Sequence, residues 1–288
     1  MMRIWLSGGR GFTGVALRRV LAERGDIVKV TTLDVRNRQL IRDEIRSFVP
    51  DAIIHLAAIS QPMHEPVLDF YDINVLGTEA VLAAASEVPE LRRVIVASSA
   101  TVYGDAAKQS AVLSEAMEPK PIGHYAISKL AMERLIQSYP ALPVIITRPF
   151  NYTGPGQSEA FLLGKVASQL RQQATRIELG SLDLERDFTS LDEVLNVYLQ
   201  FLDRCSFHQG VVNICSGKAQ SLRSLVECLI EEAGGRAEIG HSEYLKRGVE
   251  IETLCGDVTR LTEWIGYVPK PLCRADLRRM LFSDEQTV

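Results

Sequence analysis

The sequence of 288 residues lacks the features of several protein classes. Its 32 Lys and Arg are outnumbered by 36 Asp and Glu, so it has no basic surplus to follow a nucleic acid. Its five cysteines form no CxxC pair and its five histidines no metal-binding pattern, so we expect reduced thiols and no metal. No apolar run approaches membrane-spanning length, and the first residues lack the apolar core of a secretory signal. We expect a cytoplasmic protein that binds neither nucleic acid nor membrane.

The first half of the chain alternates strand-like and helical patterns. Such alternation predicts parallel strands joined by right-handed helical crossovers, with helices on both faces of one sheet. The predicted fold class is therefore α/β, a doubly wound parallel sheet of Rossmann type. We expect strands at 3–6, 27–33, 52–56, 93–98 and 143–148, and helices at 15–23, 40–48, 78–86 and 128–138.

After residue 148 the pattern changes to loops rich in Gly and Pro, with short strands and further helices. We predict a dinucleotide-binding domain at 1–150, to which some later segments return, and a smaller α/β substrate lobe at 151–288. A ligand cleft is expected between them. The second-lobe elements are expected as strands at 176–179 and 211–215 and helices at 160–172, 191–202 and 222–232.

A glycine-rich loop follows the first predicted strand and opens the first helix. Gly8, Gly11 and Gly14 have GxxGxxG spacing, with Arg10 and Phe12 between them. Glycines at this junction permit a tight turn, close approach of a pyrophosphate to the backbone, and close packing of helix on strand. Because both the strand and the helix are present, the loop predicts a dinucleotide site rather than a plain turn.

Two further segments add a catalytic pattern. Tyr125 and Lys129 are four residues apart at the start of a predicted helix, which puts them on one face. A phenol with a pKa near 10 is a weak acid at neutral pH, and a cation about 4 Å away contributes roughly 4 kcal/mol toward its ionisation. We therefore predict that Lys129 assists Tyr125 in acid–base catalysis. The other segment places Ser99 four residues before Tyr103.

These motifs resemble the extended short-chain dehydrogenases, also called the NAD-dependent epimerase/dehydratase family. The resemblance implies Ser99, Tyr125 and Lys129 as catalytic residues around a nicotinamide cofactor. Structural roles remain open for several of the implied cofactor contacts, since Ala57 and Asn74 could be packing residues and Asp34 a turn or helix cap. The implied cofactor contacts are Gly8, Arg10, Gly11, Phe12, Gly14, Asp34, Ala57, Asn74, Lys129 and Phe150.

The segment expected to select the cofactor departs from the family. Few residues separate Gly25 from Asp34, so the second strand is shortened or missing, and with it the acid that pairs with the ribose of NAD. Arg10 resembles the loop arginine of GDP-fucose synthases, and Arg36 lies near the expected adenosine end. We predict a preference for NADPH, with NAD possible.

Segments 148–157, 186–188 and 212–217 resemble GDP-4-keto-6-deoxy-D-mannose reductases. By that resemblance Asn151, Arg186, Arg247 and Glu250 bind the nucleotide-sugar substrate, and an arginine fork suits its diphosphate. An internal ion pair between Arg186 and Asp187 is the alternative. The helices around Thr78 and Ser128 are the usual pairing faces in this family, so the resemblance also implies a homodimer.

The expected reaction is reduction of the 4-keto group of a nucleotide-activated 4-keto-6-deoxyhexose, from GDP-4-keto-6-deoxy-D-mannose to GDP-D-rhamnose. A 4,6-dehydratase is disfavoured, because Ala100 and Thr101 stand where its acid and base would be. A GDP-fucose synthase is disfavoured because Thr101 replaces its cysteine. An NAD-dependent C4 epimerase resembling UDP-galactose 4-epimerase remains the main alternative, and a non-catalytic dinucleotide sensor a lesser one.

Overall fold

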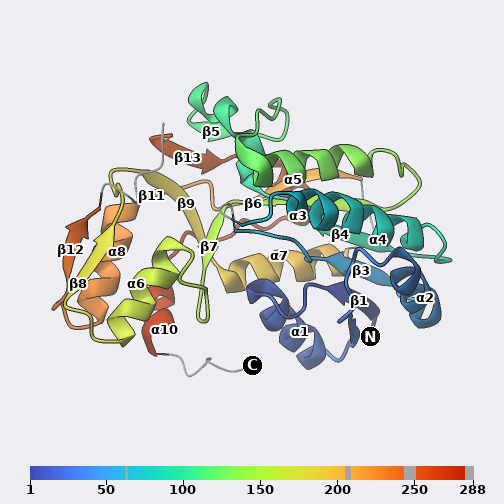
Figure 1. The fold of residues 1–288 in the computed structure, drawn as a ribbon, viewed down its shortest axis with the longest axis horizontal. Coiled ribbons are helices and arrows are strands. Elements are labelled where there is room, and N and C mark those ends of the chain that lie inside the picture. The colour runs from blue at the N-terminus through green and yellow to red at the C-terminus, as the bar shows by residue number, and fades with distance from the viewer. Residues whose placement is uncertain (62–63, 205–208, 243–250, 283–288) are drawn as a thin grey trace.

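The computed structural model describes residues 1–61, 64–204, 209–242 and 251–282. Its larger lobe is built on a six-stranded parallel sheet with the order β10-β6-β4-β3-β1-β2, and Figure 1 shows this sheet with its helices beside a smaller lobe. This confirms the predicted doubly wound α/β fold. The sheet strands are β1 (Arg3–Ser7), β2 (Ile27–Val30), β3 (Ala52–His55), β4 (Arg93–Ala97), β6 (Val144–Pro149) and β10 (Gly210–Ile214).

Helices cover both faces of this sheet, which explains why its central strands are apolar along their whole length. One face packs against α1, α7 and α9, and the other against α2, α4 and α5. Short helical segments connect several of these elements. The helices are α1 (Phe12–Glu23), α2 (Arg38–Phe48), α3 (Leu68–Tyr71), the π-helix η1 (Asp72–Gly77), α4 (Thr78–Ala85), η2 (Ala100–Tyr103), η3 (Asp105–Lys108), α5 (Gly123–Ile136), α7 (Leu191–Asp203) and α9 (Thr259–Ile265).

The second strand is present but short. β2 has four residues, pairs only with β1 within the described sheet, and forms its edge. The chain then turns through Asp34 into α2, whose first turn is capped by the Asn37 side chain accepting from the Leu40 N–H. The strand is therefore shortened rather than missing.

The smaller lobe packs three helices against short strands around a separate apolar core. One strand expected here belongs elsewhere: β10, predicted at 211–215 among the second-lobe elements, pairs in parallel with β6 and completes the large sheet. Its apolar residues fit either place, so pattern alone could not choose. The elements outside the large sheet are β5 (Val112–Leu113), β7 (Asn151–Thr153), α6 (Leu162–Arg171), β8 (Arg176–Leu179), β9 (Glu185–Ser190), β11 (Ala219–Ser221), α8 (Leu222–Glu232), β12 (Glu238–His241), β13 (Thr253–Gly256) and α10 (Arg274–Phe282).

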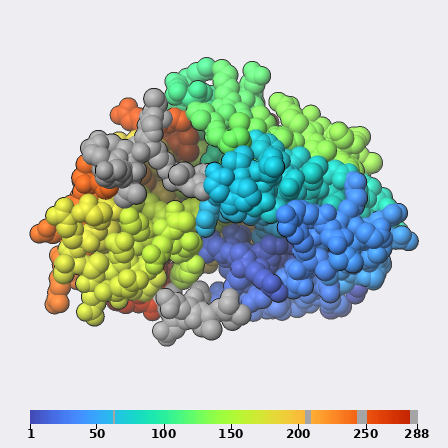
Figure 2. Space-filling view, in the orientation of Figure 1, coloured from blue at the N-terminus to red at the C-terminus, as the bar shows by residue number. Residues whose placement is uncertain are grey.

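The molecular surface is hollowed between the two lobes. Figure 2 shows this hollow between the yellow-green atoms of the smaller lobe and the cyan and blue atoms of the larger one, with the blue N-terminal segment at its floor. In an open parallel sheet, ligands bind beyond the carboxyl ends of the strands.

Within the described residues, no helix combines the length and apolar character needed to cross a membrane.

Candidate active site

The glycine loop joins the carboxyl end of β1 to the first turn of α1. Gly8 has a φ of 69°, and its carbonyl accepts a hydrogen bond from Gly11 N–H at 3.0 Å. A Cβ on Gly8 would lie 2.6 Å from the Ala57 backbone nitrogen, and one on Gly14 would lie 2.1 Å from the Gly8 carbonyl oxygen. The loop therefore requires glycine at both positions.

This cradle fits the pyrophosphate of a dinucleotide. The backbone turns over the N-terminus of α1, where unsatisfied N–H groups favour an anion. Arg10 is exposed on the loop and Phe12 begins the helix. Gly8, Arg10, Gly11, Phe12 and Gly14 thus lie together in one turn, as a cofactor site needs.

A buried histidine supports this cradle from below. The ring of His55, at the end of β3, contacts Ser7 Oγ through Nδ1 at 2.6 Å and Thr78 Oγ1 through Nε2 at 3.0 Å. The same Ser7 hydroxyl accepts from the Ala57 N–H at 3.2 Å. Burial, with the nearby charge of Lys129, lowers the pKa of His55 to about 3. His55 is therefore neutral, and its two hydrogen bonds link β3 to β1 and α4 beside the loop.

The three predicted catalytic residues come together at the carboxyl edge of the sheet. Ser99 follows β4, and Tyr125 and Lys129 lie one turn apart on α5. The Ser99 hydroxyl lies near enough to the Tyr125 phenol to lower its pKa. The Ser99 oxygen also accepts from the Thr101 hydroxyl at 2.9 Å and the Thr101 N–H at 3.2 Å, which fixes its orientation.

Burial governs the protonation of both Tyr125 and Lys129. It raises the pKa of Tyr125 to about 12, and the nearby Ser99 hydroxyl offsets only part of that rise. Burial lowers the pKa of Lys129 to about 8, and its ammonium donates to the Ala97 carbonyl at 2.7 Å. The assistance of Lys129 to the phenol stays a prediction.

Two of the other proposed cofactor contacts have side chains engaged within the protein. Asn74 accepts from the Ile59 N–H at 2.9 Å and donates to the Ile59 carbonyl at 3.2 Å and to Ser128 at 2.9 Å. Its side chain holds the loop after β3 to α5, and Ala57 lies in that loop beside Gly8. Phe150 is buried, with its ring 6.2 Å from that of Tyr103 in a small apolar cluster.

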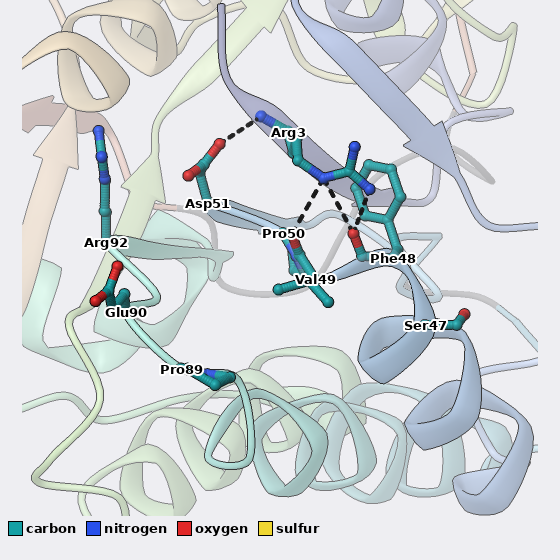
Figure 3. A pocket seen from close by; sticks show the side chains of 9 residues that line it. All are labelled: Arg3, Ser47, Phe48, Val49, Pro50, Asp51, Pro89, Glu90 and Arg92. Atoms are coloured by element: carbon teal, nitrogen blue, oxygen red, sulfur yellow. Dashed lines mark hydrogen bonds between the residues drawn. The ribbon is translucent and has the colours of Figure 1, made fainter.

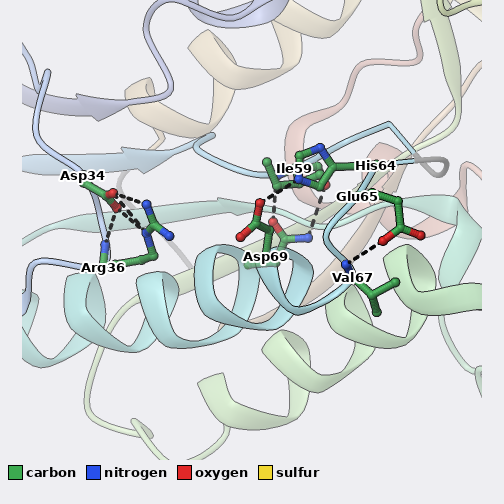
Figure 4. Close-up of polar contacts among 8 residues, drawn as sticks. Asp34, Arg36, Ile59, His64, Glu65, Val67 and Asp69 are labelled. Atoms are coloured by element: carbon green, nitrogen blue, oxygen red, sulfur yellow. Dashed lines mark hydrogen bonds and ion pairs between the residues drawn. The ribbon is translucent and has the colours of Figure 1, made fainter.

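The expected adenosine end carries an ion pair of its own. Figure 4 shows Asp34 and Arg36 facing each other at the turn after β2. The Asp34 carboxylate accepts from Arg36 Nη2 at 2.5 Å, from Nε at 3.0 Å and from the Arg36 N–H at 2.9 Å. Arg36 also experiences the charges of Asp69 and Asp72. Its positive charge is therefore already compensated, which weakens the sequence argument that it favours NADPH.

Two of the expected substrate residues lie on paired strands. Asn151 is on β7 and Arg186 on β9, and the Asn151 amide donates to the Asp187 carbonyl at 3.4 Å. Arg186 Nη1 donates to the Glu185 carbonyl at 2.7 Å and the Glu252 carbonyl at 3.2 Å. Arg247 and Glu250 lie outside the described residues.

The Asp187 carboxylate binds backbone groups. It is fully buried and accepts from Ser216 N–H and Gly217 N–H, each at 2.9 Å, and from Ser216 Oγ at 2.7 Å. A longer contact of 3.3 Å comes from Gly256 N–H. Asp187 on β9 thus links the end of β10 and β13 by hydrogen bonds, which is a structural role.

A separate hollow of about 330 Å³ lies away from this set of residues. Figure 3 shows Arg3, Asp51 and Arg92 around it, at the amino ends of β1, β3 and β4. Parallel α/β sheets bind ligands at the opposite edge. The candidate active site is therefore the carboxyl edge, beside the glycine loop.

Known proteins resemble this chain along most of its length. A family model described as the NAD dependent epimerase/dehydratase family matches residues 4–215. The chain belongs to this family. It is similar to the GDP-6-deoxy-D-mannose reductase of Pseudomonas aeruginosa, with 31% identity over 300 residues that cover 99% of this chain and 98% of that protein. It is also similar to the GDP-6-deoxy-D-talose 4-dehydrogenase of Aggregatibacter actinomycetemcomitans, with 30% identity and 92% of each chain covered.

The structural comparison gives the same result. The structure of RMD from Pseudomonas aeruginosa complexed with NADPH superposes with a TM-score of 0.87 at 30% identity, covering 98% of this chain and 96% of that one. Membership of the epimerase/dehydratase family identifies the chain as an oxidoreductase of the extended short-chain dehydrogenase type. The cofactor is a nicotinamide dinucleotide, and the reactions of the family's nucleotide-sugar branch are 4-reduction, 4-dehydrogenation and 4-epimerisation.

Sequence reasoning missed three residues of this site. The sequence argument used Thr101 only as a replacement, for a dehydratase acid–base residue and for a synthase cysteine, although its hydroxyl orients Ser99. His55 and Glu133 were not considered at all. A histidine ending an apolar strand and a glutamate four residues after Lys129 were visible signals, but their partners are distant in the sequence.

Proposed function

We propose that this enzyme reduces the 4-keto group of a nucleotide-activated 4-keto-6-deoxyhexose, converting GDP-4-keto-6-deoxy-D-mannose to GDP-D-rhamnose. The observation that carries the proposal is that Ser99 and Tyr125, with Lys129 one turn away, lie at the sheet edge that also bears the glycine cradle. The similarity to a GDP-6-deoxy-D-mannose reductase over nearly the whole chain supports this choice of substrate.

The nicotinamide cofactor supplies the hydride when bound. Tyr125 donates a proton to the sugar oxygen as the ketone becomes an alcohol, and Ser99 holds that oxygen by a hydrogen bond. Lys129 is held at the Ala97 carbonyl by one of its three N–H groups, and we assign the others to the cofactor ribose and the phenol. The glycine cradle fixes the pyrophosphate, with NADPH as the preferred cofactor.

The substrate is placed by the second lobe. We propose that Asn151 and Arg186 hold the diphosphate, supported by their position on neighbouring strands β7 and β9. Because arginine presents a planar fork of N–H donors, it suits a phosphate anion. Arg247 and Glu250 are proposed to contact the nucleotide on the basis of the sequence alone.

The test is to incubate the purified enzyme with NADPH or NADH and GDP-4-keto-6-deoxymannose, following cofactor absorbance and identifying the sugar by NMR. Stoichiometric oxidation with GDP-D-rhamnose as product supports the proposal. Formation of GDP-6-deoxy-D-talose would keep the reductase but reverse the stereochemistry at C4. Interconversion of UDP-hexoses at C4 without net oxidation would establish the epimerase instead.

We also propose a cytoplasmic homodimer, paired through the face formed by η1, α4 and α5. Large apolar side chains are exposed on or beside this face, with Leu76 on η1 at 59%, Ile127 on α5 at 40%, Ile122 just before α5 at 61% and Leu68 on the adjoining α3 at 70%. Exposed apolar side chains gathered on one face are typical of an association surface. A Leu76→Glu variant is expected to shift the mass in light-scattering chromatography from dimer to monomer, and a monomeric wild type would refute the pairing.

A further inference from the structure

A buried glutamate lies one turn beyond the proposed catalytic lysine. Glu133 follows Lys129 by four residues on α5, so the two side chains share one face of the helix. Each residue is only 3% exposed. A carboxylate is almost never buried so fully unless it is paired, so its partners indicate what it does.

Three donor atoms from two other residues form hydrogen bonds with this carboxylate. The Ser98 hydroxyl donates to Glu133 at 2.5 Å, and Arg148 donates through Nε at 2.9 Å and Nη2 at 2.6 Å. Ser98 directly precedes Ser99 after β4, and Arg148 lies on β6. Glu133 therefore connects the helix that carries Tyr125 and Lys129 to the strand end that carries Ser99.

The same carboxylate balances the charge around Lys129. Burial lowers the pKa of Lys129, and the negative charge of Glu133 opposes that effect. Lys129 also interacts with the Ala97 carbonyl from β4 and with the neutral ring of His55 from β3. Arg148 on β6 is a second cation at this carboxylate, to which it donates two hydrogen bonds.

We propose that Glu133 is a positioning residue for the catalytic set, which locks α5 against the end of β4 and gives the buried Lys129 ammonium its counter-charge. The catalytic consequence rests on the proposed ketoreductase function, because it assumes that Lys129 acts as a cation beside Tyr125. Without Glu133, Lys129 loses its proton at a lower pH, and proton transfer from Tyr125 fails earlier as the pH rises.

The direct test measures the protonation of Lys129 and needs no substrate. In protein labelled with ¹³C at lysine Cε, the Lys129 signal is assigned by its loss in Lys129→Met and titrated by NMR. The wild-type signal is expected to titrate near pH 8. In Glu133→Gln it is expected to titrate about one pH unit lower, because a neighbouring opposite charge shifts a pKa by about that much or more.

The kinetic test follows kcat against pH with the 4-keto sugar and NADPH. Glu133→Gln is expected to move the alkaline limb by about one pH unit to lower pH, so that kcat falls about tenfold at pH 8.5 and much less at pH 6. Affinity for NADPH at pH 6 should stay within about twofold of the wild type. An unchanged NMR titration and an unchanged limb in a folded variant would overturn the proposal.

Two control variants separate charge from packing. Ser98→Ala removes one hydrogen bond to Glu133 but no charge. It should lower the free energy of unfolding without shifting the alkaline limb of the kcat–pH profile. Glu44→Gln removes a carboxylate on α2 that contacts Trp5 Nε1 at 2.8 Å and Lys29 at 3.3 Å, remote from the site. It should leave both the Lys129 titration and the limb unchanged.

Removing Glu133 alone leaves Arg148 without its buried partner and could prevent folding. The double variant Glu133→Gln with Arg148→Met removes both charges, and such replacements are often tolerated. Because Arg148 is itself a cation, its loss offsets part of the effect, so the proposal expects a smaller lowering of the Lys129 titration in the double variant than in Glu133→Gln. If neither variant folds, Glu133 has no role separable from folding and the proposal is rejected. A wild type without turnover refutes the proposed function, while the NMR result still decides the role of Glu133.

Discussion

The catalytic and adenosine ends of the proposed cofactor path are built differently. At the catalytic end, Ser99 and Lys129 are 9% and 3% exposed, and they are held by Thr101 on η2 and by the Ala97 carbonyl of β4. At the adenosine end, the side chains of Asp34 and Arg36 are each about half exposed and bind each other. Exposed ion pairs contribute about 0–1 kcal/mol, whereas buried polar groups are costly to leave unpaired. Burial thus fixes the positions of Ser99 and Lys129, whereas Asp34 and Arg36 at the adenosine end are held by a weak, exposed ion pair.

The largest expected effect is at the catalytic end. Tyr125→Phe keeps the ring but removes the proton donor, so kcat should fall about 1,000-fold, within the usual range for acid–base catalysis. Steady-state kinetics and NADPH titration check this, with cofactor affinity expected to be unchanged. Tyr139→Phe, which loses only a 2.9 Å hydrogen bond to Glu79, is the matched control and should keep full activity. Unchanged turnover in Tyr125→Phe would refute the mechanism.

The next effect is on stability against pH. The pKa of His55 in the folded protein is about 3, below its usual value of 6.5. Its contribution to the free energy of unfolding is therefore complete above pH 6.5 and is lost as the pH falls toward 3. At pH 4 the loss is on the order of 3 kcal/mol, since each pH unit amounts to about 1.4 kcal/mol. His55→Gln, which has no titrating group there, should show a flatter dependence of Tm between pH 7 and 4. Parallel profiles would show that other groups control acid unfolding.

A smaller effect separates the two hydroxyls at the reacting oxygen. Ser99→Ala should lower kcat about 100-fold, comparable to loss of one oxyanion donor. Thr101→Val should lower kcat only about fivefold, because it removes one orienting hydrogen bond worth about 1 kcal/mol. Equal losses in the two variants would mean that Thr101 contacts the substrate itself.

The smallest effect is at the adenosine end. Asp34→Asn should release Arg36 for the 2′-phosphate of NADPH and raise the ratio of NADPH to NADH affinity about threefold. Arg36→Ala should change the wild-type ratio little, since Asp34 already compensates that arginine. Fluorescence titration with both cofactors measures the ratio. A tenfold loss of NADPH affinity in Arg36→Ala would show that Arg36 binds the phosphate despite its partner.

The sequence predicted the features that depend on local pattern. All five strands expected in the first half are present in one parallel sheet, because doubly buried strands are apolar and the crossover helices repeat at 3.6 residues. The glycine loop was predicted from its place between β1 and α1, the pairing of Tyr125 and Lys129 on one helix face from their spacing, and the role of Ser99 from the family resemblance.

Features that depend on distant partners were not predicted. Glu133 meets Arg148 across 15 residues, and His55 meets Ser7 across 48. The alternative ion pair between Arg186 and Asp187 was reasonable for adjacent opposite charges. The Asp187 carboxylate instead accepts backbone N–H groups about 30 residues away, which no spacing rule reveals.

The return of β10 to the large sheet makes the two lobes interdependent. A chain cut after residue 150 would leave β6 with one row of its backbone N–H and C=O groups unpaired along most of its length, since β10 pairs with five of its six residues. Such an open edge invites pairing with other chains. The cofactor lobe is therefore not a detachable module, and the substrate lobe could be exchanged between relatives only as an insertion that brings the chain back to β6.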